Sequence, residues 1–221
     1  MSRIIMSLAL LSILAVGCDD QQSSTQAYQH APQQAKPVVS IVPVIDNTKD
    51  ACNWNISDEL TSALYARLSQ DNNFYLVDIS QVRSKTKKLH DNQNPFGTDI
   101  GWIKKVFQGD EFIAFAELIE HDEILRQDRK KSVDPKTCAA DLKMAMRLRV
   151  FDVRGKEPKI VLQEIITNRH FVPRQYTKMN YHQPAWGEDG FSFSPVGLAH
   201  GELTKEIAQR FEDYILLSSR N

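Results

Sequence analysis

Leu142-Lys143-Met144-Ala145-Met146-Arg147-Leu148-Arg149-Val150 is the stretch that decides the fold of this 221-residue chain. Large apolar residues at the even positions alternate with polar or small residues at the odd positions. A period of two is typical of a β-strand with one buried face and one polar face. Residues 152–156 then read as a polar turn and residues 160–167 as a returning strand. Together these segments predict an antiparallel hairpin.

The sequence before this hairpin predicts a parallel unit. Residues 38–44, VVSIVPV, are β-branched and apolar on both faces, which indicates a strand buried on both sides. Residues 56–68 carry apolar side chains at helical spacing, and Asn55 is a suitable N-cap. Residues 74–78, FYLVD, predict a second strand. Strand, helix and strand joined by short links predict a βαβ unit.

Further elements complete one domain. We expect short helices at residues 79–89 and 99–107 and a strand at 112–119. A final amphipathic helix should follow, with Ser194 as its N-cap and Pro195 at its first position. The charged stretch at 120–136 predicts a loop or an extension of the hairpin. The expected fold is therefore α/β (α+β), a single domain at residues 37–221 with a mixed sheet and flanking helices.

The amino-terminal segment predicts a lipid anchor. Arg3 precedes an apolar run at residues 4–16, and Ala15-Val16-Gly17 stands directly before Cys18. The run is too short to span a bilayer permanently and is typical of a secretory signal. We therefore expect residues 1–17 to be a signal peptide cleaved between Gly17 and Cys18. The Cys18 sulfur would receive the diacylglycerol, and the new amino terminus would be acylated.

Residues 18–36 predict a lipidated cysteine followed by a disordered tether, because they are rich in Gln, Ser and Ala and nearly lack apolar residues. Asp19 resembles the signal that retains lipoproteins at the inner membrane in enteric bacteria. We expect a protein anchored on the periplasmic side of the cell membrane. The net charge of −1 argues against a nucleic-acid partner.

Two further cysteines, Cys52 and Cys138, lie in the expected folded domain. The compartment outside the cytoplasm is oxidising, so a disulfide between them is predicted. The alternative is two thiols, because sequence cannot place two Cα atoms within bridging distance.

Catalytic and metal-binding motifs are not found in the sequence. Phosphate-loop, dinucleotide, zinc-protease and nucleophile-elbow patterns are missing, and the six histidines lack metal-ligand spacing. We therefore expect no enzyme, no metal and no cofactor beyond the covalent lipid. His121-Asp122-Glu123 is the one cluster that could supply acid–base groups, and a charged loop explains it equally well.

A long loop at residues 172–193 is rich in aromatic residues. Tyr176, Tyr181, Trp186 and Phe191 are candidates for a partner surface, because aromatic side chains often anchor interfaces. The alternative is that these rings fold back and cover the sheet.

The order of these elements resembles a known group of envelope proteins. The VxIVPV strand, the helix SDELTSALYARLSQ, the strand FIAFAELIE and the hairpin turn VFDVRGK are similar to uncharacterised lipoproteins of the chlamydial type. These belong to the wider group of the TolB amino-terminal domain, CsgG and LpoB. The resemblance implies a mixed sheet with packed helices and work through protein–protein contact without catalysis.

We therefore expect a membrane-anchored envelope lipoprotein that acts as a non-catalytic interaction or assembly module. Its partner would be another envelope protein or a second copy of the chain. The alternative is an envelope small-ligand binder or enzyme that uses the His121 region or the 172–193 loop.

Overall fold

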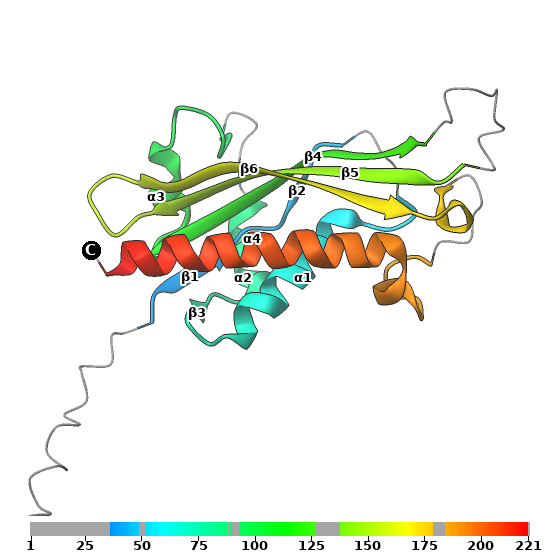
Figure 1. The fold of residues 1–221 in the computed structure, drawn as a ribbon. Helices are drawn as coiled ribbons and strands as arrows, with labels where there is room; N and C mark the ends of the chain where they lie inside the picture. The colour runs from blue at the N-terminus through cyan, green and yellow to red at the C-terminus, as the bar shows by residue number, and fades with distance from the viewer. Residues whose placement is uncertain are drawn as a thin grey trace, which may run out of the picture. The chain divides into compact units, whose positions relative to one another are not determined.

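The computed structural model describes residues 36–48, 52–87, 89, 93–126, 138–178 and 184–220. At its centre lies a six-stranded mixed sheet with the strand order β3-β1-β4-β5-β6, in which β2 pairs with β4 (Figure 1). The predicted signal peptide, Cys18 and the tether up to residue 35 lie outside the described residues. The predicted fold class, a single α/β domain with a mixed sheet and flanking helices, is confirmed.

The predicted βαβ unit is confirmed. It consists of β1 (Val38–Ile41), α1 (Ile56–Gln70) and β3 (Tyr75–Leu76), and the two strands pair in parallel. Asn55 caps the helix, since its side chain accepts a hydrogen bond of 3.1 Å from the Asp58 amide.

A second crossover leads to the longest strands. It contains α2 (Ile79–Thr86) and α3 (Gly101–Val106), and it ends in β4 (Phe112–Leu125), which lies parallel to β1. The short strand β2 (Ile45–Asp46) also pairs with β4 in parallel. The strand β4 continues to Leu125, so residues 120–125 of the charged stretch extend the antiparallel pairing of β4 with β5.

The predicted antiparallel hairpin is also confirmed, and its strands are longer than expected. They are β5 (Ala140–Asp152) and β6 (Lys159–Val172), and β5 pairs with both β4 and β6. The 3-10 turns η2 (Arg174–Tyr176) and η4 (Phe191–Phe193) follow, and then α4 (Pro195–Ser219). The Ser194 hydroxyl caps α4 by accepting a 3.0 Å hydrogen bond from the Gly197 amide.

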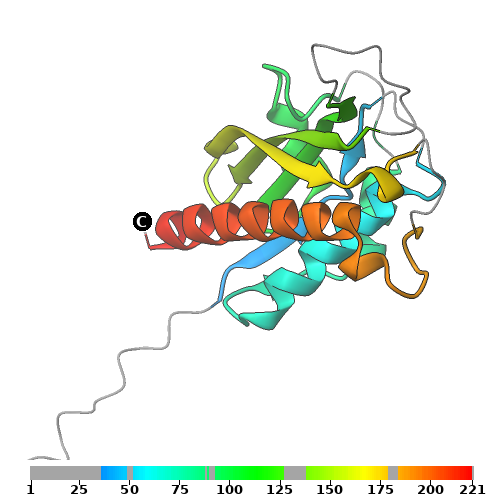
Figure 2. The same ribbon diagram turned by 45° about the vertical axis from the view of Figure 1, so that its right-hand side comes forward.

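Helices pack on both faces of the sheet. The helices α1 and α4 lie on the inner face of the sheet (Figure 2). They enclose the main hydrophobic core against the even-numbered side chains of β5. On the outer face, α2 and α3 form a second cluster with Ile113, Phe115 and Phe151. The predicted half-buried strand carries its polar face on this side, but Arg149 of that face is buried, because Phe151 and residues 95–97 lie against it.

The predicted disulfide between Cys52 and Cys138 is not supported. The structure contains no bridge between these residues; Cys138 is buried and Cys52 is partly buried. A disulfide requires Cα atoms within about 7 Å and aligned Cβ atoms. Cys52 precedes α1 and Cys138 precedes β5, so only the tertiary fold could bring their Cα atoms within bridging distance.

The described helices of this chain are too short or too polar to cross a membrane. Within that part of the chain, none combines the length and the apolar character that crossing a bilayer requires.

Candidate functional site

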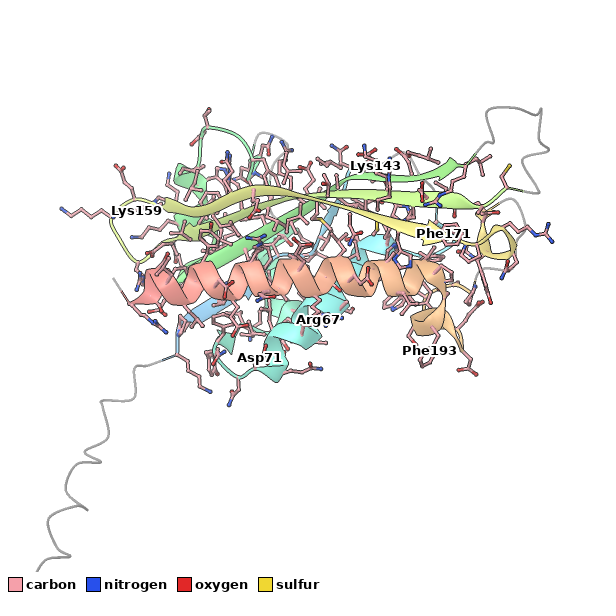
Figure 3. All side chains as sticks on the ribbon, viewed as in Figure 1. Arg67, Asp71, Lys143, Lys159, Phe171 and Phe193 are labelled. Atoms are coloured by element: carbon pink, nitrogen blue, oxygen red, sulfur yellow. The ribbon has the colours of Figure 1, made fainter. Side chains whose placement is uncertain are left out.

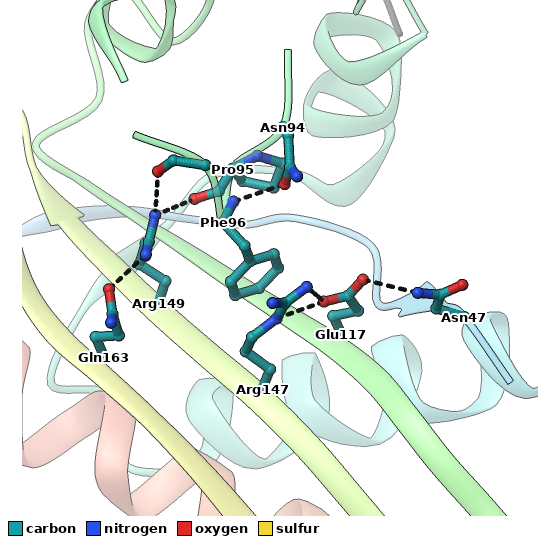
Figure 4. Close-up of polar contacts among 9 residues, drawn as sticks. Asn47, Asn94, Pro95, Phe96, Glu117, Arg147, Arg149 and Gln163 are labelled. Carbon is teal, nitrogen blue, oxygen red and sulfur yellow. Dashed lines mark hydrogen bonds and ion pairs between the residues drawn. The ribbon is translucent and has the colours of Figure 1, made fainter. Parts of the chain in front are cut away.

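A buried arginine lies at the centre of the outer face of the sheet. The Arg149 side chain projects from β5, and the residue is only 7% exposed. Its Nη1 donates to the carbonyl oxygens of Pro95 (2.9 Å) and Gly97 (2.8 Å), and its Nη2 donates to Oε1 of Gln163 on β6 (Figure 4). The guanidinium thus holds residues 95–97 against the sheet.

The segment held in this way carries an aromatic ring across the strand. The Asn94 side chain accepts a 2.8 Å hydrogen bond from the Phe96 amide, which closes a tight turn. The Phe96 ring then lies against Arg147, whose Cζ is 4.4 Å from the ring centroid, while Cζ of Arg149 is 5.7 Å away. Both distances are within the range of a cation–π contact.

Arg147 also has a charged partner on the neighbouring strand. Its Nε and Nη2 both donate to Oε2 of Glu117 on β4, the first at 2.7 Å. The other oxygen of Glu117 accepts a 3.4 Å hydrogen bond from the Asn47 side chain. The carboxylate of Glu117 therefore neutralises Arg147.

Arg149 is not neutralised in the same way. Within the described part of the chain, no carboxylate lies within 4.0 Å of its guanidinium, and its buried Nε finds no hydrogen-bond acceptor. Burial and the nearby charge of Arg147 both lower the pKa of Arg149 below its usual value. Arg147 is therefore paired with a carboxylate, whereas Arg149 has none in contact within the described residues.

A pocket of about 450 Å³ opens beside these groups. It is lined by Phe96, Arg147, Arg149, Gln163, Glu164 and Ile165. Its volume is within the range of small-ligand sites, about 300–1,000 Å³. Sequence reasoning missed this pocket, because Arg147 and Arg149 read as the polar face of a strand and Phe96 lay in a predicted loop.

A second cluster of polar side chains lies in the main core. His121 of β4 and His200 of α4 meet through their Nε2 atoms at 3.0 Å, and Nδ1 of His200 lies 2.7 Å from Oε1 of Glu59 in α1. The Trp54 indole donates to the other oxygen of Glu59 at 2.7 Å. The three ionisable residues are each 2–4% exposed, so they connect β4, α4 and α1 away from solvent.

The structure separates the residues of the predicted acid–base cluster. His121 and Glu123 lie on the inner face of β4 opposite Met144 and Leu142, whereas Asp122 lies on the other face and is exposed. One carboxylate oxygen of Glu123 accepts a 3.0 Å hydrogen bond from the Lys178 amide. Within the described residues, no group of three or more His, Cys, Asp or Glu side chains could hold a metal ion.

The predicted aromatic surface is also divided. Phe191 is buried and meets the Trp54 ring edge-on at 5.4 Å between centroids, so it belongs to the core and cannot anchor a partner. Tyr176 packs partly against the same core, while Trp186 is 40% exposed. Tyr181 lies outside the described residues.

The edge strand β6 offers a more continuous surface. Within the described residues it pairs only with β5, so the backbone groups along its other side have no strand partner. Lys159 and Phe171 mark its two ends (Figure 3). Its outward side chains include Ile165 and Phe171, which are 56% and 48% exposed. Sequence reasoning predicted the strand but could not place it at the edge.

Comparison with known proteins supports the fold. A model described as a family of unknown function (DUF7499) matches residues 23–219. The hypothetical protein CT253 from Chlamydia trachomatis is similar in structure, with a TM-score of 0.60 and 24% identity over 82% of this chain and 98% of that chain. No curated protein matches the chain.

Two lipoprotein structures are more distant. Lipoprotein GNA1162 from Neisseria meningitidis has a TM-score of 0.46 and 13% identity, covering 80% of this chain and 99% of that one. The LpoB C-terminal domain from Salmonella enterica has a TM-score of 0.32 and 19% identity, covering 60% and 82%. The expected likeness to a chlamydial protein is thus confirmed at the level of the fold.

Proposed function

The chain belongs to the family of unknown function DUF7499, and we propose that it is an envelope lipoprotein that binds another protein without catalysing a reaction. The lipid on Cys18 would hold it on the periplasmic side of the membrane, and the tether would let the folded domain reach its partner. Asp19 favours the inner membrane. Anchoring raises the local concentration of a weak binder without adding contacts.

The open edge of β6 is the observation that carries this proposal. A strand of 14 residues whose outer backbone groups have no strand partner among the described residues can accept a strand from another chain, and exposed apolar side chains add contact area. The buried histidines favour binding over catalysis, because a substrate could not reach His121 or His200 without opening the core.

Crosslinking in intact envelopes tests the proposal. The full chain is compared with Cys18→Ala and with Ile165→Lys, which puts a charge on the outer side of β6. Leu198→Lys is the matched control, because Leu198 is also exposed (47%) but lies in the first turn of α4. All four proteins are expressed at the same level.

We expect the wild type and Leu198→Lys to capture the same defined envelope protein or a second copy of the chain. Ile165→Lys should lose most of the adduct, and Cys18→Ala should no longer enrich it. If the wild type captures neither, the docking proposal fails. An unchanged adduct in Ile165→Lys would remove β6 as the docking surface.

A further inference from the structure

The pocket beside Phe96 contains a buried arginine, Arg149, that has no carboxylate within 4.0 Å in the described part of the chain. A buried cation without a counter-ion is costly, because the protein interior solvates it less well than water does. In Arg149 the donors of Nη1 and Nη2 are directed to neutral oxygens, those of Pro95, Gly97 and Gln163. These bonds orient the guanidinium but leave its charge in place.

Donors at the pocket wall remain available to a ligand. Arg147 uses Nε and Nη2 for Glu117, so its Nη1 has no hydrogen bond within the described residues, and 37% of its side chain is exposed. The Gln163 side chain uses Oε1 for Arg149, which leaves its amide Nε2 without an acceptor in the same part of the chain. Both residues line the pocket.

The unpaired Arg149 guanidinium and the apolar side chains of the pocket indicate the class of ligand. Glu164 also lines the pocket, but its carboxylate lies 3.9 Å from Nη2 of Arg210 on α4, an atom that Glu206 also approaches to 3.8 Å, and it makes no contact with Arg149. Arg149 is therefore the pocket arginine without a carboxylate in contact among the described residues, and the walls include the Phe96 ring and the exposed Ile165. Arginine pairs well with a carboxylate through directed, charge-assisted hydrogen bonds.

We propose that this pocket is a binding site for a carboxylate carried on an apolar body. The carboxylate would accept hydrogen bonds from Nη1 of Arg147 and Nε2 of Gln163, and the apolar body would lie against Phe96 and Ile165. The inference does not depend on the docking proposal, because a free carboxylic acid or an acidic residue beside an apolar one on a partner protein would fit the same groups.

Gln163→Glu provides the sharpest variant. It replaces the side-chain amide that accepts a hydrogen bond from Arg149 with a carboxylate, which can pair with the Arg149 guanidinium in the absence of a ligand. Gln209→Glu adds the same charge at an exposed position of α4 and serves as the control. Near-ultraviolet circular dichroism shows whether each variant is folded.

The experiment measures the thermal midpoint of the purified full chain against increasing sodium benzoate, with sodium chloride at the same ionic strength as reference. We expect a saturable rise of about 3–6 °C in the wild type and in Gln209→Glu at roughly tenfold excess over Kd. Gln163→Glu should show no benzoate response and should start from a higher midpoint.

The absence of a saturable rise in the wild type, or an equal rise in Gln163→Glu, would overturn the proposal. An equal response to sodium phosphate would overturn the choice of a carboxylate. Benzoate added during envelope crosslinking then shows where the natural carboxylate comes from. If benzoate abolishes the adduct with the partner protein, the carboxylate belongs to a side chain of that partner. If the adduct is retained, the carboxylate belongs to a free acid.

Discussion

Two glycines in α4 should respond in opposite ways when each is replaced by alanine. At Gly197, an added Cβ would lie 1.9 Å from the carbonyl oxygen of Phe191 and 2.8 Å from its carbonyl carbon. At Gly201, the nearest atom to an added Cβ is Nη2 of Arg67 at 3.8 Å, which is an ordinary contact. Both residues lie within α4, Gly197 in its first turn and Gly201 one turn further along the helix.

The magnitudes follow from these contacts. Alanine in place of a helical glycine stabilises by about 0.5–1 kcal/mol where space allows, and this is the expected gain for Gly201→Ala. In Gly197→Ala the Phe191 carbonyl must retreat from 1.9 Å to at least 3.0 Å. It cannot do so freely, because the amide and hydroxyl of Ser194 both donate to it, at 2.9 and 2.7 Å. Overpacking typically costs about 1–3 kcal/mol, which outweighs the gain in propensity.

Urea unfolding followed by circular dichroism measures both changes. We expect Gly197→Ala to lower the free energy of unfolding by about 1–2 kcal/mol and Gly201→Ala to raise it by about 0.5–1 kcal/mol. An equal m-value in all three proteins shows that the midpoints report stability alone. A Gly197→Ala variant as stable as the wild type would refute the reasoning that the η4–α4 junction admits only glycine there.

Two further predictions concern charged side chains. Glu59→Ala removes the acceptor of the Trp54 indole and should lower the free energy of unfolding by at least about 2 kcal/mol in chemical denaturation. The control Glu206→Ala, at an exposed position, should change it by less than about 0.5 kcal/mol. Equal effects of the two substitutions would contradict a structural role for the buried network. Burial opposes ionisation of Asp152, but hydrogen bonds from Arg154 outweigh it and hold the pKa of Asp152 below its usual value. This contribution to stability is present above the ordinary aspartate pKa, about 3.9, and is lost as the pH falls through the folded value. In acid titrations Asp152→Asn should therefore be less stable than wild type at pH 7 and should lose less stability below about pH 4; parallel curves would contradict this.

Local signals account for most of the fold that sequence reasoning recovered. Asn55 and Ser194 mark helix starts because their side chains accept hydrogen bonds from amides only three residues ahead. The alternation at 142–150 specifies a strand because successive side chains of a strand point to opposite faces. Such interactions act within a few residues, so a single sequence is sufficient to reveal them.

The candidate pocket was not predictable in this way, because its residues lie far apart in the sequence. Arg149 and Pro95 are separated by 54 positions, and they meet only because the 93–97 segment folds over the outer face of the sheet. The alternating pattern of β5 placed Arg149 on the polar face of the strand. That pattern carries no information about which segment of the chain covers this face. The same holds for Phe191, which the sequence offered as a contact residue and the fold placed against Trp54.

The sequence by itself thus determined the local elements, their order and the expectation of a lipid anchor at Cys18, because each depends on neighbouring residues. Only the tertiary structure decided which polar groups are buried together. It joined Glu59 to His200 across 141 positions and His121 to His200 across 79. It also placed β6 at the edge of the sheet and left the charge of Arg149 without a counter-ion in the described chain. The physical reason is that burial and charge balance depend on every segment packed around a residue, and sequence spacing does not fix those segments.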